Sequence, residues 1–499
     1  MNLKSILVGI EGLKAKGNLN LDISSIECDY RTVKQGSLFV AIKGYEYDGH
    51  TFISKAIENG AKAIIFEEGA NYKEFINFKD ITFIMAPNTR LALSLCACNF
   101  YDNPSKKMKI IGITGTKGKT TTSFMLKRIF EKAGKKVGLI GTIAIYIGDS
   151  KVKNSDRTTP EGNKLQEILA KMYELGVEIV IMEVSSQSLK LDRVAGIEFY
   201  AGIFTNLSED HISPKEHKDM QEYLSCKLKL FDMCKYAIIN ADNIYTHKVI
   251  GEIKDKCSVS TYGIDNYCDL LAKDVTVTNT YADFKVKLEN KNERVKVSIP
   301  GRFSVYNSLA AIKVAELFNI SKDTIKEALE DVKVLGRSEL VDNKLDLKIM
   351  IDYAHTPDSL ENILKTAKQY TIGKVICVFG CGGDRDKNKR HLMGEISGRI
   401  ADYTIITSDN PRTENPEDII ADIEKGIKKT KGNYESITDR KEAITKAIAM
   451  EKKNDLLIIA GKGHEMYQEI NKEQIPFDER KIINEIVNNL QEKSKKKKK

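Results

Sequence analysis

Lys109-Ile110-Ile111-Gly112-Ile113-Thr114-Gly115-Thr116-Lys117-Gly118-Lys119-Thr120-Thr121-Thr122 is the stretch that decides the fold. Its apolar first half predicts a buried strand, its glycines predict a tight turn, and apolar residues at helical spacing beyond it predict a helix. Glycine lets the backbone approach an anion, and the N-terminus of a helix offers N–H groups and a positive dipole end. The stretch therefore predicts phosphate binding, with Lys119 reaching the outer phosphates and the Thr120 hydroxyl binding Mg²⁺.

The spacing departs from the general P-loop, because five residues rather than four separate Gly112 from Gly118. A Gly-Lys-Thr sequence also occurs by chance in surface turns. The strand before the glycines and the helix after them favour a phosphate site over that alternative.

Length and composition limit the class of protein. A chain of 499 residues has room for about three domains. No uninterrupted apolar run is long enough to span a membrane, and residues 1–6 lack the features of a signal peptide. Nine cysteines without a Cys-x-x-Cys pair suit the reducing cytoplasm. Six C-terminal lysines carry most of the net charge of +8, and the remaining +2 does not support nucleic-acid binding.

Residues 1–106 are predicted to form a small N-terminal α/β domain. Strand-like runs cover residues 37–42 and 63–66, with a helix over 52–59 between them. Asn103-Pro104 marks the expected boundary before the P-loop strand. The polar segments 28–31 and 43–50 are either ordinary turns or binding loops, and the sequence alone leaves this open.

The central segment, residues 107–336, repeats the pattern of an apolar strand followed by a polar loop. Such loops begin at Gly141, Glu183 and Thr205. Continuous apolar strands alternating with helices predict a parallel sheet covered on both faces, with ligands at the carboxyl ends of its strands. Glu183 and His211 then fall on the same edge as the P-loop. Each alone is ordinarily a loop residue, but together beside a P-loop they favour a metal site.

Lys227 is unusual because it shares the apolar stripe of a predicted helix with Leu224, Leu228 and Phe231. A bare ammonium on an apolar face is costly unless it is paired or neutralised. Alternatively, the side chain snorkels from the margin of the stripe into water, and the sequence alone favours this interpretation.

The third segment, residues 337–490, repeats strand, loop and helix four times. Its loops, at 352–357, 380–386, 408–412 and 461–465, carry His355, Arg385, Arg412 and Glu465. Two arginines at one sheet edge suit bidentate binding of a carboxylate or a phosphate. We expect an α/β protein of three domains, in which the central P-loop ATPase domain has a parallel sheet and the C-terminal domain is doubly wound and Rossmann-like. Residues 491–499 are expected to form a disordered lysine tail.

These loops give the chain a resemblance to the Mur ligase family that covers all but the lysine tail. The motifs that carry it are Gly115 to Thr121, Thr158-Thr159-Pro160, Glu183 to Ser186, Thr205 to Leu207 with Asp210-His211, Tyr223-Leu224 with Lys227, Asp352 to Pro357, Gly380 to Arg385, Asp409 to Arg412, and Gly461 to Glu465. Members of the family use ATP and Mg²⁺ to join an amino acid to a UDP-linked muramoyl peptide. The resemblance implies an N-terminal domain for the uridine nucleotide, a central ATPase domain and a C-terminal domain that closes over the site.

The resemblance also implies roles for individual residues. The implied catalytic residues are Lys119, Glu183, His211 and Lys227, and the implied metal ligands are Thr120, Glu183, His211 and Lys227 as a carbamate. The implied ATP-binding residues are Gly115, Thr116, Lys117, Gly118, Lys119, Thr120, Thr121, Asn307, Arg337 and His355. The residues expected to contact the UDP-muramoyl dipeptide are Tyr30, Thr158, Thr159, Ser185 and Arg193. A carbamate would turn the misplaced cation of Lys227 into an anionic metal ligand.

The implied reaction is carboxylate activation in the synthesis of peptidoglycan precursors from small-molecule substrates. A D-glutamate carboxylate attacks the γ-phosphate, and the incoming amine then attacks the acyl phosphate. In the family, Asp409-Asn410-Pro411-Arg412 accompanies meso-diaminopimelate, whereas lysine-adding members lack the arginine. The residues implied to bind diaminopimelate are Arg385, Asp409, Asn410, Pro411, Arg412, Gly461 and Glu465. Arg412 would hold its second carboxylate, and meso-lanthionine would satisfy the same contacts.

Two alternatives have different functions. Folylpolyglutamate synthetase, an amide ligase of the same superfamily, shares the P-loop and the lysine but lacks the combined motifs at 409–412 and 461–465. A nucleotide-binding switch protein would hydrolyse ATP weakly without making a bond. The intact set of Lys119, Glu183, His211 and Lys227 argues against such a protein.

Overall fold

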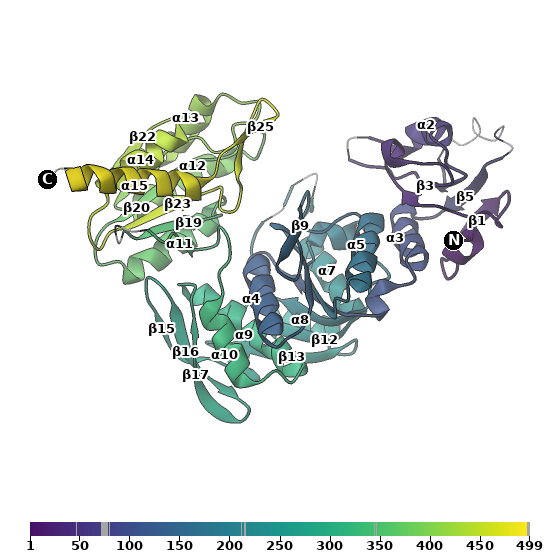
Figure 1. Cartoon of the computed structure of the whole chain (residues 1–499), viewed down its shortest axis with the longest axis horizontal. Helices are drawn as coiled ribbons and strands as arrows, with labels where there is room; N and C mark the ends of the chain where they lie inside the picture. The colour runs from purple at the N-terminus through teal and green to yellow at the C-terminus, as the bar shows by residue number, and fades with distance from the viewer. Residues whose placement is uncertain are drawn as a thin grey trace. The chain divides into compact units, whose positions relative to one another are not determined.

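The computed structural model describes residues 1–45, 47–70, 78, 80–210, 212–213, 216–343, 345 and 347–496, with side chains as far as residue 492 (Figure 1). The chain divides into two compact units, Met1–Leu271 with Tyr306–Ala328, and Ala272–Val305 with Leu329–Lys499. The division into three domains with boundaries at 106 and 336 remains a prediction.

The first unit begins with a five-stranded sheet in the order β1-β5-β4-β3-β2. Strands β2 to β5 pair in parallel, and β1 is antiparallel to β5. The elements are α1 (Leu3–Ile6), β1 (Lys14–Lys16), β2 (Ile26–Glu27), η1 (Tyr30–Thr32), β3 (Leu38–Val40), η2 (Gly49–Phe52), α2 (Ile53–Glu58), β4 (Ala63–Glu67), β5 (Thr82–Ala86) and α3 (Thr89–Phe100). Ile64 and Ile65 point to opposite faces of β4, so α2 covers one face and α1 with α3 covers the other.

The same unit contains a nine-stranded sheet in the order β14-β13-β12-β11-β6-β10-β7-β8-β9. Its strands are β6 (Lys109–Thr114), β7 (Val137–Ile140), β8 (Ala144–Ile147), β9 (Ser150–Asn154), β10 (Ile179–Glu183), β11 (Phe199–Phe204), β12 (Cys234–Asn240), β13 (Ser258–Gly263) and β14 (Leu270–Leu271). Its helical segments are η4 (Pro104–Lys106), α4 (Lys119–Lys132), α5 (Gly162–Glu174), α6 (Ser186–Lys190), α7 (Met220–Leu228), η5 (Lys229–Met233) and α8 (Thr246–Ile253). Two further helices are α9 (Arg302–Leu317) and α10 (Lys322–Asp331), and the boundaries between the two units in the sequence fall within them.

The central sheet is parallel from β14 to β7 but not throughout. Strands β7, β8 and β9 form an antiparallel extension that the sequence did not predict. Every residue of β9 is exposed, and Lys151 and Lys153 keep this edge charged. An exposed, lysine-bearing edge strand lacks the apolar run by which the buried parallel strands were recognised.

The second unit contains a six-stranded sheet in the order β18-β19-β23-β20-β21-β22. Its elements are β18 (Glu339–Leu340), β19 (Ile349–Asp352), α11 (Pro357–Tyr370), β20 (Val375–Phe379), α12 (Asn388–Ile400), β21 (Tyr403–Ile406), α13 (Pro416–Ile427), β22 (Tyr434–Ser436), α14 (Arg440–Met450), β23 (Leu456–Ala460) and α15 (Glu479–Lys496). Cys377 and Phe379 pack with α11 to α13, whereas Ile376 and Val378 pack with α14 and α15. Helices on both faces of a largely parallel sheet make this part doubly wound, as the sequence predicts.

Two smaller sheets were not predicted from the sequence, and one helix extends farther than predicted. An antiparallel sheet of β15 (Lys273–Val277), β16 (Ala282–Leu288) and β17 (Lys291–Val297) was not predicted, although buried and exposed residues alternate along β16. The hairpin of β24 (Tyr467–Ile470) and β25 (Glu473–Pro476) follows the 461–465 loop. Helix α15 extends to Lys496, so the predicted disordered tail at 491–499 is wrong for residues 491–496. The buried stripe of Ile483 and Val487 anchors this helix to the core.

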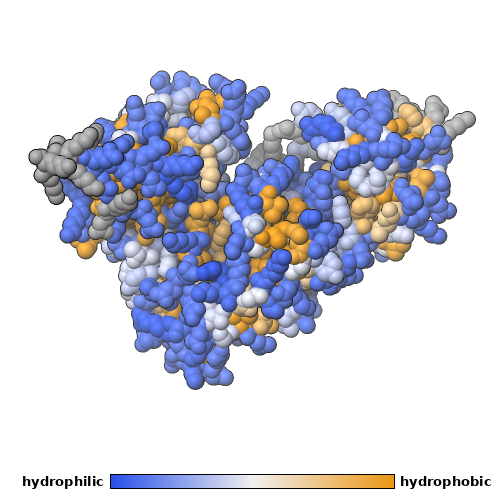
Figure 2. Space-filling model, viewed as in Figure 1, coloured by the Kyte–Doolittle hydropathy of each residue, from blue (hydrophilic) through white to orange (hydrophobic). Residues whose placement is uncertain are grey.

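Hydrophilic residues dominate the face seen in Figure 2, in keeping with a chain that is 30% charged. Among the described residues, no helix is both long enough and apolar enough to cross a membrane.

Candidate active site

The P-loop lies between the end of β6 and the start of α4. Gly115 (φ +145°) and Gly118 (φ +87°) take backbone conformations that favour glycine. A Cβ at Gly115 would lie 2.0 Å from Thr205 Oγ1, and one at Gly118 would lie 2.5 Å from Asn307 Oδ1. The sequence predicts that Gly112, like Gly115 and Gly118, lets the backbone approach an anion, and this is wrong. A Cβ at Gly112 would lie 2.8 Å from the Phe199 ring. Gly112 therefore serves sheet packing rather than the approach of an anion.

The loop that follows β11 holds the P-loop in shape. Thr116 N donates to Asn206 O (2.9 Å), and Lys117 N donates to Asn206 Oδ1 (2.9 Å). Thr205 Oγ1 donates in turn to Lys117 O at 2.6 Å. Because the main-chain N–H groups of Thr116 and Lys117 are used in this way, an anion at this loop would meet the first turn of α4, whose N–H groups have no acceptor within the helix. Lys119 Nζ lies over the loop, donating to Gly115 O (2.8 Å) and Thr116 O (3.0 Å).

Glu183 ends β10 directly beside this turn and is fully buried. Its carboxylate accepts hydrogen bonds from Thr120 Oγ1, Thr142 Oγ1 and Thr142 N, each at 3.0 Å. These three donors are neutral, so they do not balance the charge of the carboxylate. A hydroxyl and a buried carboxylate are oxygen donors of the kind that Mg²⁺ prefers, so Thr120 and Glu183 fit the metal. The predicted ligand His211 lies outside the described residues.

Lys227 lies inside the first unit, with only 1% of its surface exposed. Its Nζ is 4.3 Å from the centre of the Tyr223 ring. Burial lowers the pKa of this amine well below its usual value, the Lys119 ammonium lowers it further, and Asp210 acts in the opposite direction. The interpretation of Lys227 as a snorkelling lysine is therefore wrong, because its side chain points inward.

Four residues predicted to contact the muramoyl dipeptide lie close to Glu183. Thr158 Oγ1 is 3.1 Å from Thr142 Oγ1, and Thr159 Oγ1 donates to Glu183 O at 2.9 Å. Ser185 N donates to Thr159 Oγ1 at 3.1 Å, and its side chain caps α6. Arg193 is buried and donates to Thr159 O (3.3 Å) and Glu161 Oε1 (3.2 Å). The structure thus groups these four residues beside Glu183, with the Arg193 guanidinium already paired to Glu161.

The remaining predicted nucleotide contacts lie apart in the chain. Tyr30 stacks on Phe52 at 4.8 Å in the N-terminal sheet region. Asn307 lies against the P-loop at Gly118. In the second unit, Arg337 lies 4.6 Å from the centre of the Tyr353 ring, and His355 packs on the same ring at 4.5 Å. Tyr353 therefore organises two of the predicted ATP-binding residues.

The edge formed by the 408–412 and 461–465 loops carries a network of charged and amide groups. Lys462 is fully buried, and its Nζ donates to Asn410 Oδ1 (2.8 Å) and Glu465 Oε2 (3.3 Å). Asn410 Nδ2 also donates to Glu465 Oε2, at 2.8 Å. Asp409 Oδ2 is buried and has no hydrogen-bond partner among the described residues, and a Cβ at Gly461 would lie 2.4 Å from it. An unpartnered buried carboxylate oxygen is a natural acceptor for an ammonium group.

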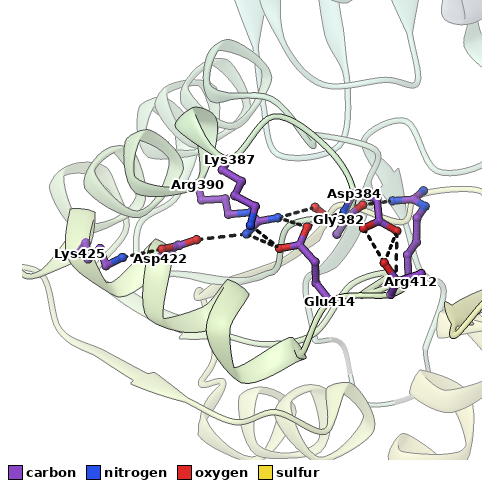
Figure 3. Close-up of polar contacts among 10 residues, drawn as sticks. Gly382, Asp384, Lys387, Arg390, Arg412, Glu414, Asp422 and Lys425 are labelled. Atoms are coloured by element: carbon purple, nitrogen blue, oxygen red, sulfur yellow. Dashed lines mark hydrogen bonds and ion pairs between the residues drawn. The ribbon is translucent and has the colours of Figure 1, made fainter.

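The two predicted arginines of this edge lie on neighbouring loops that a buried arginine joins. Figure 3 shows Arg390 between Glu414 and Asp422, with Arg412 at the other end of the network near Asp384. Arg390 donates to both oxygens of Glu414 (2.8 and 3.0 Å) and holds its pKa down to about 2. Asp384 N also donates to Glu414 Oε1, at 2.6 Å, which ties the loop of Arg385 to the loop of Arg412.

A second buried arginine lies beneath the same edge. Arg440 Nε donates to Glu479 Oε1 at 2.7 Å, and both side chains are fully buried. Arg440 also donates to Ser408 O (3.2 Å) and Ala460 O (2.8 Å), which immediately precede Asp409 and Gly461. The Arg440 guanidinium thus fixes the spacing between the chain after β21 and the end of β23.

Three protein-family models match the sequence that carries these loops. They are the Mur ligase family catalytic domain over residues 22–101, the Mur ligase middle domain over 113–315, and the Mur ligase glutamate ligase domain over 336–463. UDP-N-acetylmuramoyl-L-alanyl-D-glutamate–2,6-diaminopimelate ligase from Clostridium tetani is 46% identical over 98% of this chain and 100% of its own length. The chain belongs to the Mur ligase family.

Two further Mur ligases agree with this result. The protein of the same name from Caldanaerobacter subterraneus is 47% identical over 98% of this chain and 99% of its own length. A solved structure of a ligase with that name matches with a TM-score of 0.71 at 29% identity, over 98% of this chain and 99% of the other. Mur ligases form amide bonds with ATP and Mg²⁺. The predicted family, α/β fold class, enzyme class and cofactors are therefore confirmed.

Some residues of this Mur ligase site were missed from the sequence. Lys462 lies in the 461–465 motif but was given no role. Its position between two glycines was the sequence feature that could have indicated a buried, functional side chain. Thr142 lies in the loop that begins at Gly141 and was assigned no role, yet it gives Glu183 two of its three hydrogen bonds. Glu469 accepts from Arg412 Nε at 2.9 Å, and no sequence pattern connects these two residues.

Proposed function

We propose that this Mur ligase adds meso-diaminopimelate, or a close isostere such as meso-lanthionine, to the D-glutamate carboxylate of UDP-N-acetylmuramoyl-L-Ala-D-Glu. The reaction belongs to peptidoglycan precursor synthesis and takes place in the cytoplasm, in keeping with nine free cysteines. The observation that carries the choice of amino acid is the placement of Arg412 on one edge with the unpartnered oxygen of Asp409. Relatives with similar sequences bear the name of this activity.

The proposed chemistry proceeds in two displacements. A carboxylate oxygen of D-glutamate attacks the γ-phosphorus and ADP leaves, and the substrate amine then attacks the acyl carbon and phosphate leaves. Lys119 and the first turn of α4 offset the charge on the phosphates, and catalysis depends mainly on position and charge. Thr120 and Glu183 would hold Mg²⁺, which when bound would neutralise phosphate charge.

Lys227 is proposed to carry a carbamate. Burial lowers the pKa of its amine well below the usual value and so favours the neutral form, which can attack CO₂, forming an N–C bond and releasing a proton to solvent. The product is an anion that the nearby Lys119 ammonium attracts. As a carbamate, Lys227 would serve the metal together with Thr120, Glu183 and His211.

The substrate contacts remain proposals that follow the clusters described above. Residues beside Glu183 are proposed to hold the muramoyl dipeptide, and the Tyr30 stack is proposed for the uridine part. The proposed residues for the dipeptide are Thr158, Thr159, Ser185 and Arg193. For the nucleotide, the P-loop residues Gly115 to Thr121 are proposed together with Asn307, Arg337 and His355.

The diamino acid is proposed to lie along the edge of the second unit. Arg412 takes the far carboxylate, Arg385 takes the carboxylate nearer the reacting amine, and Asp409 with Glu465 takes the far ammonium. Asn410, Pro411 and Gly461 shape the edge. Because Lys462 and Asn410 already occupy Glu465 Oε2, the free Asp409 oxygen is the stronger candidate for the ammonium.

Phosphate release tests the proposal directly. The protein is given ATP, Mg²⁺ and the UDP-muramoyl dipeptide with a panel of amino acids that includes meso-diaminopimelate, meso-lanthionine and L-lysine. We expect release that requires both the dipeptide and a diamino acid with two carboxylates. Release that needs neither would indicate a nucleotide switch, and release with a folate and glutamate would indicate the folylpolyglutamate alternative.

A further inference from the structure

The hairpin of β24 and β25 lies along the backbone of Arg412. Arg412 N donates to Glu469 O at 3.0 Å, and Asn471 N donates to Arg412 O at 2.8 Å. Arg412 also forms an isolated parallel bridge with Ile470. Its φ of +53° lies in the left-handed region, which a residue with a side chain adopts at a cost. The hairpin therefore holds Arg412 in a backbone conformation that it would not adopt alone.

Glu469 also fixes the side chain of Arg412. Arg412 Nε donates to Glu469 Oε2 at 2.9 Å, and Nη1 donates to Gly383 O at 2.8 Å. Among the residues that the structure describes, Arg412 Nη2 has no hydrogen-bond partner. Two bonds to a planar guanidinium fix both its place and its plane. They leave the Nη2 corner available for one more acceptor.

A third contact joins Glu469 to the same loop, since Glu469 N donates to Asn410 Oδ1 at 3.0 Å. That amide oxygen also accepts from the Lys462 ammonium, at 2.8 Å. The hairpin thus contacts both ends of the edge. The Glu469 carboxylate binds the Arg412 guanidinium, and the Glu469 N–H binds Asn410, which also contacts Lys462 and Glu465.

We propose that Glu469 is a positioning residue that orients Arg412 toward the far carboxylate of the diamino acid and so sets the preference for a substrate with two carboxylates. The inference rests on the proposed function. Because Glu469 balances the charge of Arg412, lysine does not leave a bare cation in the site. Discrimination then comes from the bond that the pre-oriented Nη2 corner gains from a second carboxylate, and preorganisation reduces the entropy that this bond costs.

The hairpin provides a matched control for the carboxylate. Glu473 lies on β25, is exposed, and has no side-chain contact with residues 409–412 in the described part of the chain. Glu469→Ala removes the acceptor for Arg412 Nε, whereas Glu469→Gln keeps an amide oxygen in its place. The backbone contacts of Glu469 are unchanged in both variants, so the hairpin itself should persist.

The test is steady-state ligation by the full chain with meso-diaminopimelate and, separately, with L-lysine, together with thermal unfolding of each variant. We expect Glu469→Ala to raise the KM for diaminopimelate about tenfold, as loss of preorganisation predicts. The kcat and the KM values for ATP, the UDP-dipeptide and lysine should stay within about twofold. Glu469→Gln should raise the diaminopimelate KM about threefold, and Glu473→Ala should not change it. In an Arg412→Ala background, Glu469→Ala should have no further effect on that KM.

Two results would overturn the proposal. One is an unchanged diaminopimelate KM in a folded Glu469→Ala or Glu469→Gln protein, while Arg412→Ala raises it; the proposed function then stands without this residue. The other is an equal loss for lysine and diaminopimelate, which indicates a structural role only. If Arg412→Ala itself leaves the diaminopimelate KM unchanged, the assignment of Arg412 under the proposed function fails, and the role of Glu469 fails with it.

Discussion

The P-loop and the 409–469 edge are both proposed to bind charged groups, yet they are built in different ways. The P-loop turn comes from one short stretch of sequence, with Gly115 and Gly118 in backbone conformations that favour glycine, although Asn206, 89 positions from Lys117, also holds its backbone. At the 409–469 edge, side chains bind partners far away in the sequence. Arg390 and Glu414 are 24 positions apart, Asn410 and Glu465 are 55 apart, and Arg412 and Glu469 are 57 apart.

This difference predicts where substitutions act. In the P-loop the backbone makes the cradle, so most side chains can change without moving it, and the exceptions are those that carry charge into the site. At the 409–469 edge each charged group positions another, so a substitution changes selectivity through its neighbours. The predictions below separate these two behaviours.

Lys119→Ala should have the largest effect. Removing a preorganised cation from the phosphates should lower the ligation rate about a hundredfold or more. Lys117→Ala should cost much less, because the main-chain N–H of Lys117, rather than its side chain, holds the loop to Asn206. Single-turnover phosphate release at saturating ATP measures both. Near-normal turnover in Lys119→Ala would show that its assignment is wrong.

Lys227→Ala should come next, with about a hundredfold loss of rate in a protein that remains folded. The matched control is Lys229→Ala, because the Lys229 side chain is about half exposed and donates to Leu189 O at 3.4 Å. Wild-type activity should fall when CO₂ is removed and return with bicarbonate. A free ammonium at Lys227 in a high-resolution map of the active, metal-bound enzyme would contradict the carbamate.

Arg412→Ala should reduce the preference for meso-diaminopimelate over L-lysine by roughly 1.5–3 kcal/mol, the range for a hydrogen bond to a charged group. The ratio of the two kcat/KM values measures this preference. Arg399→Ala is the surface control, since its side chain is 57% exposed and pairs with Glu395 on the same helix, α12. Equal efficiency with both amino acids in the wild type would rule out the role of Arg412 in selection.

Glu414→Gln should have the smallest effect on the reaction and should act on stability. The folded pKa of Glu414 is about 2, below its ordinary value of 4.5, so its ionised form stabilises the fold. This contribution is fully present above about pH 4.5 and is lost as the pH falls toward 2. At neutral pH the variant should lose roughly 1.5–3 kcal/mol of unfolding free energy, seen as a lower denaturant midpoint.

The difference in midpoint between wild type and Glu414→Gln should therefore shrink as the solution is acidified. Glu417→Gln, an exposed glutamate on α13, is the control and should shift the midpoint little at any pH. A difference that is independent of pH would show that the Arg390–Glu414 pair does not stabilise the fold through charge.

The same contrast explains what could be predicted from the sequence. The strand, turn and helix around Lys119, and the four loops after buried strands in the second unit, depend on local patterns of apolar residues and glycine. Strand β9 and the β15–β17 sheet lack continuous apolar runs, and the short apolar run of β8 belongs to an antiparallel hairpin that a pattern of parallel strands does not predict. The direction of the Lys227 side chain depends on which elements pack around α7. The spacing of apolar residues along a helix carries no information about its neighbours.

Some contacts of the candidate site could likewise be predicted from the sequence, and others could not. Glu183 and Thr120 were predicted together, and they meet at 3.0 Å because two strand ends of a parallel sheet share an edge. The bond of Arg412 to Glu469 depends on how a hairpin folds back over a loop 57 positions earlier. Neither residue carries a local signal for this contact, so only the structure gives it.

The buried pair of Arg440 and Glu479 also bears on the order in which the molecule is completed during synthesis. Arg440 holds the carbonyls of Ser408 and Ala460, and within the described structure it forms an ion pair with Glu479 at the start of α15. If this sheet folded before residue 479 had left the ribosome, the guanidinium would be a buried charge without its carboxylate, a state that costs about 3–5 kcal/mol. The 409–469 edge can therefore be completed only late in translation. A chain that stalls before α15 carries an incomplete edge, however well its P-loop has already folded.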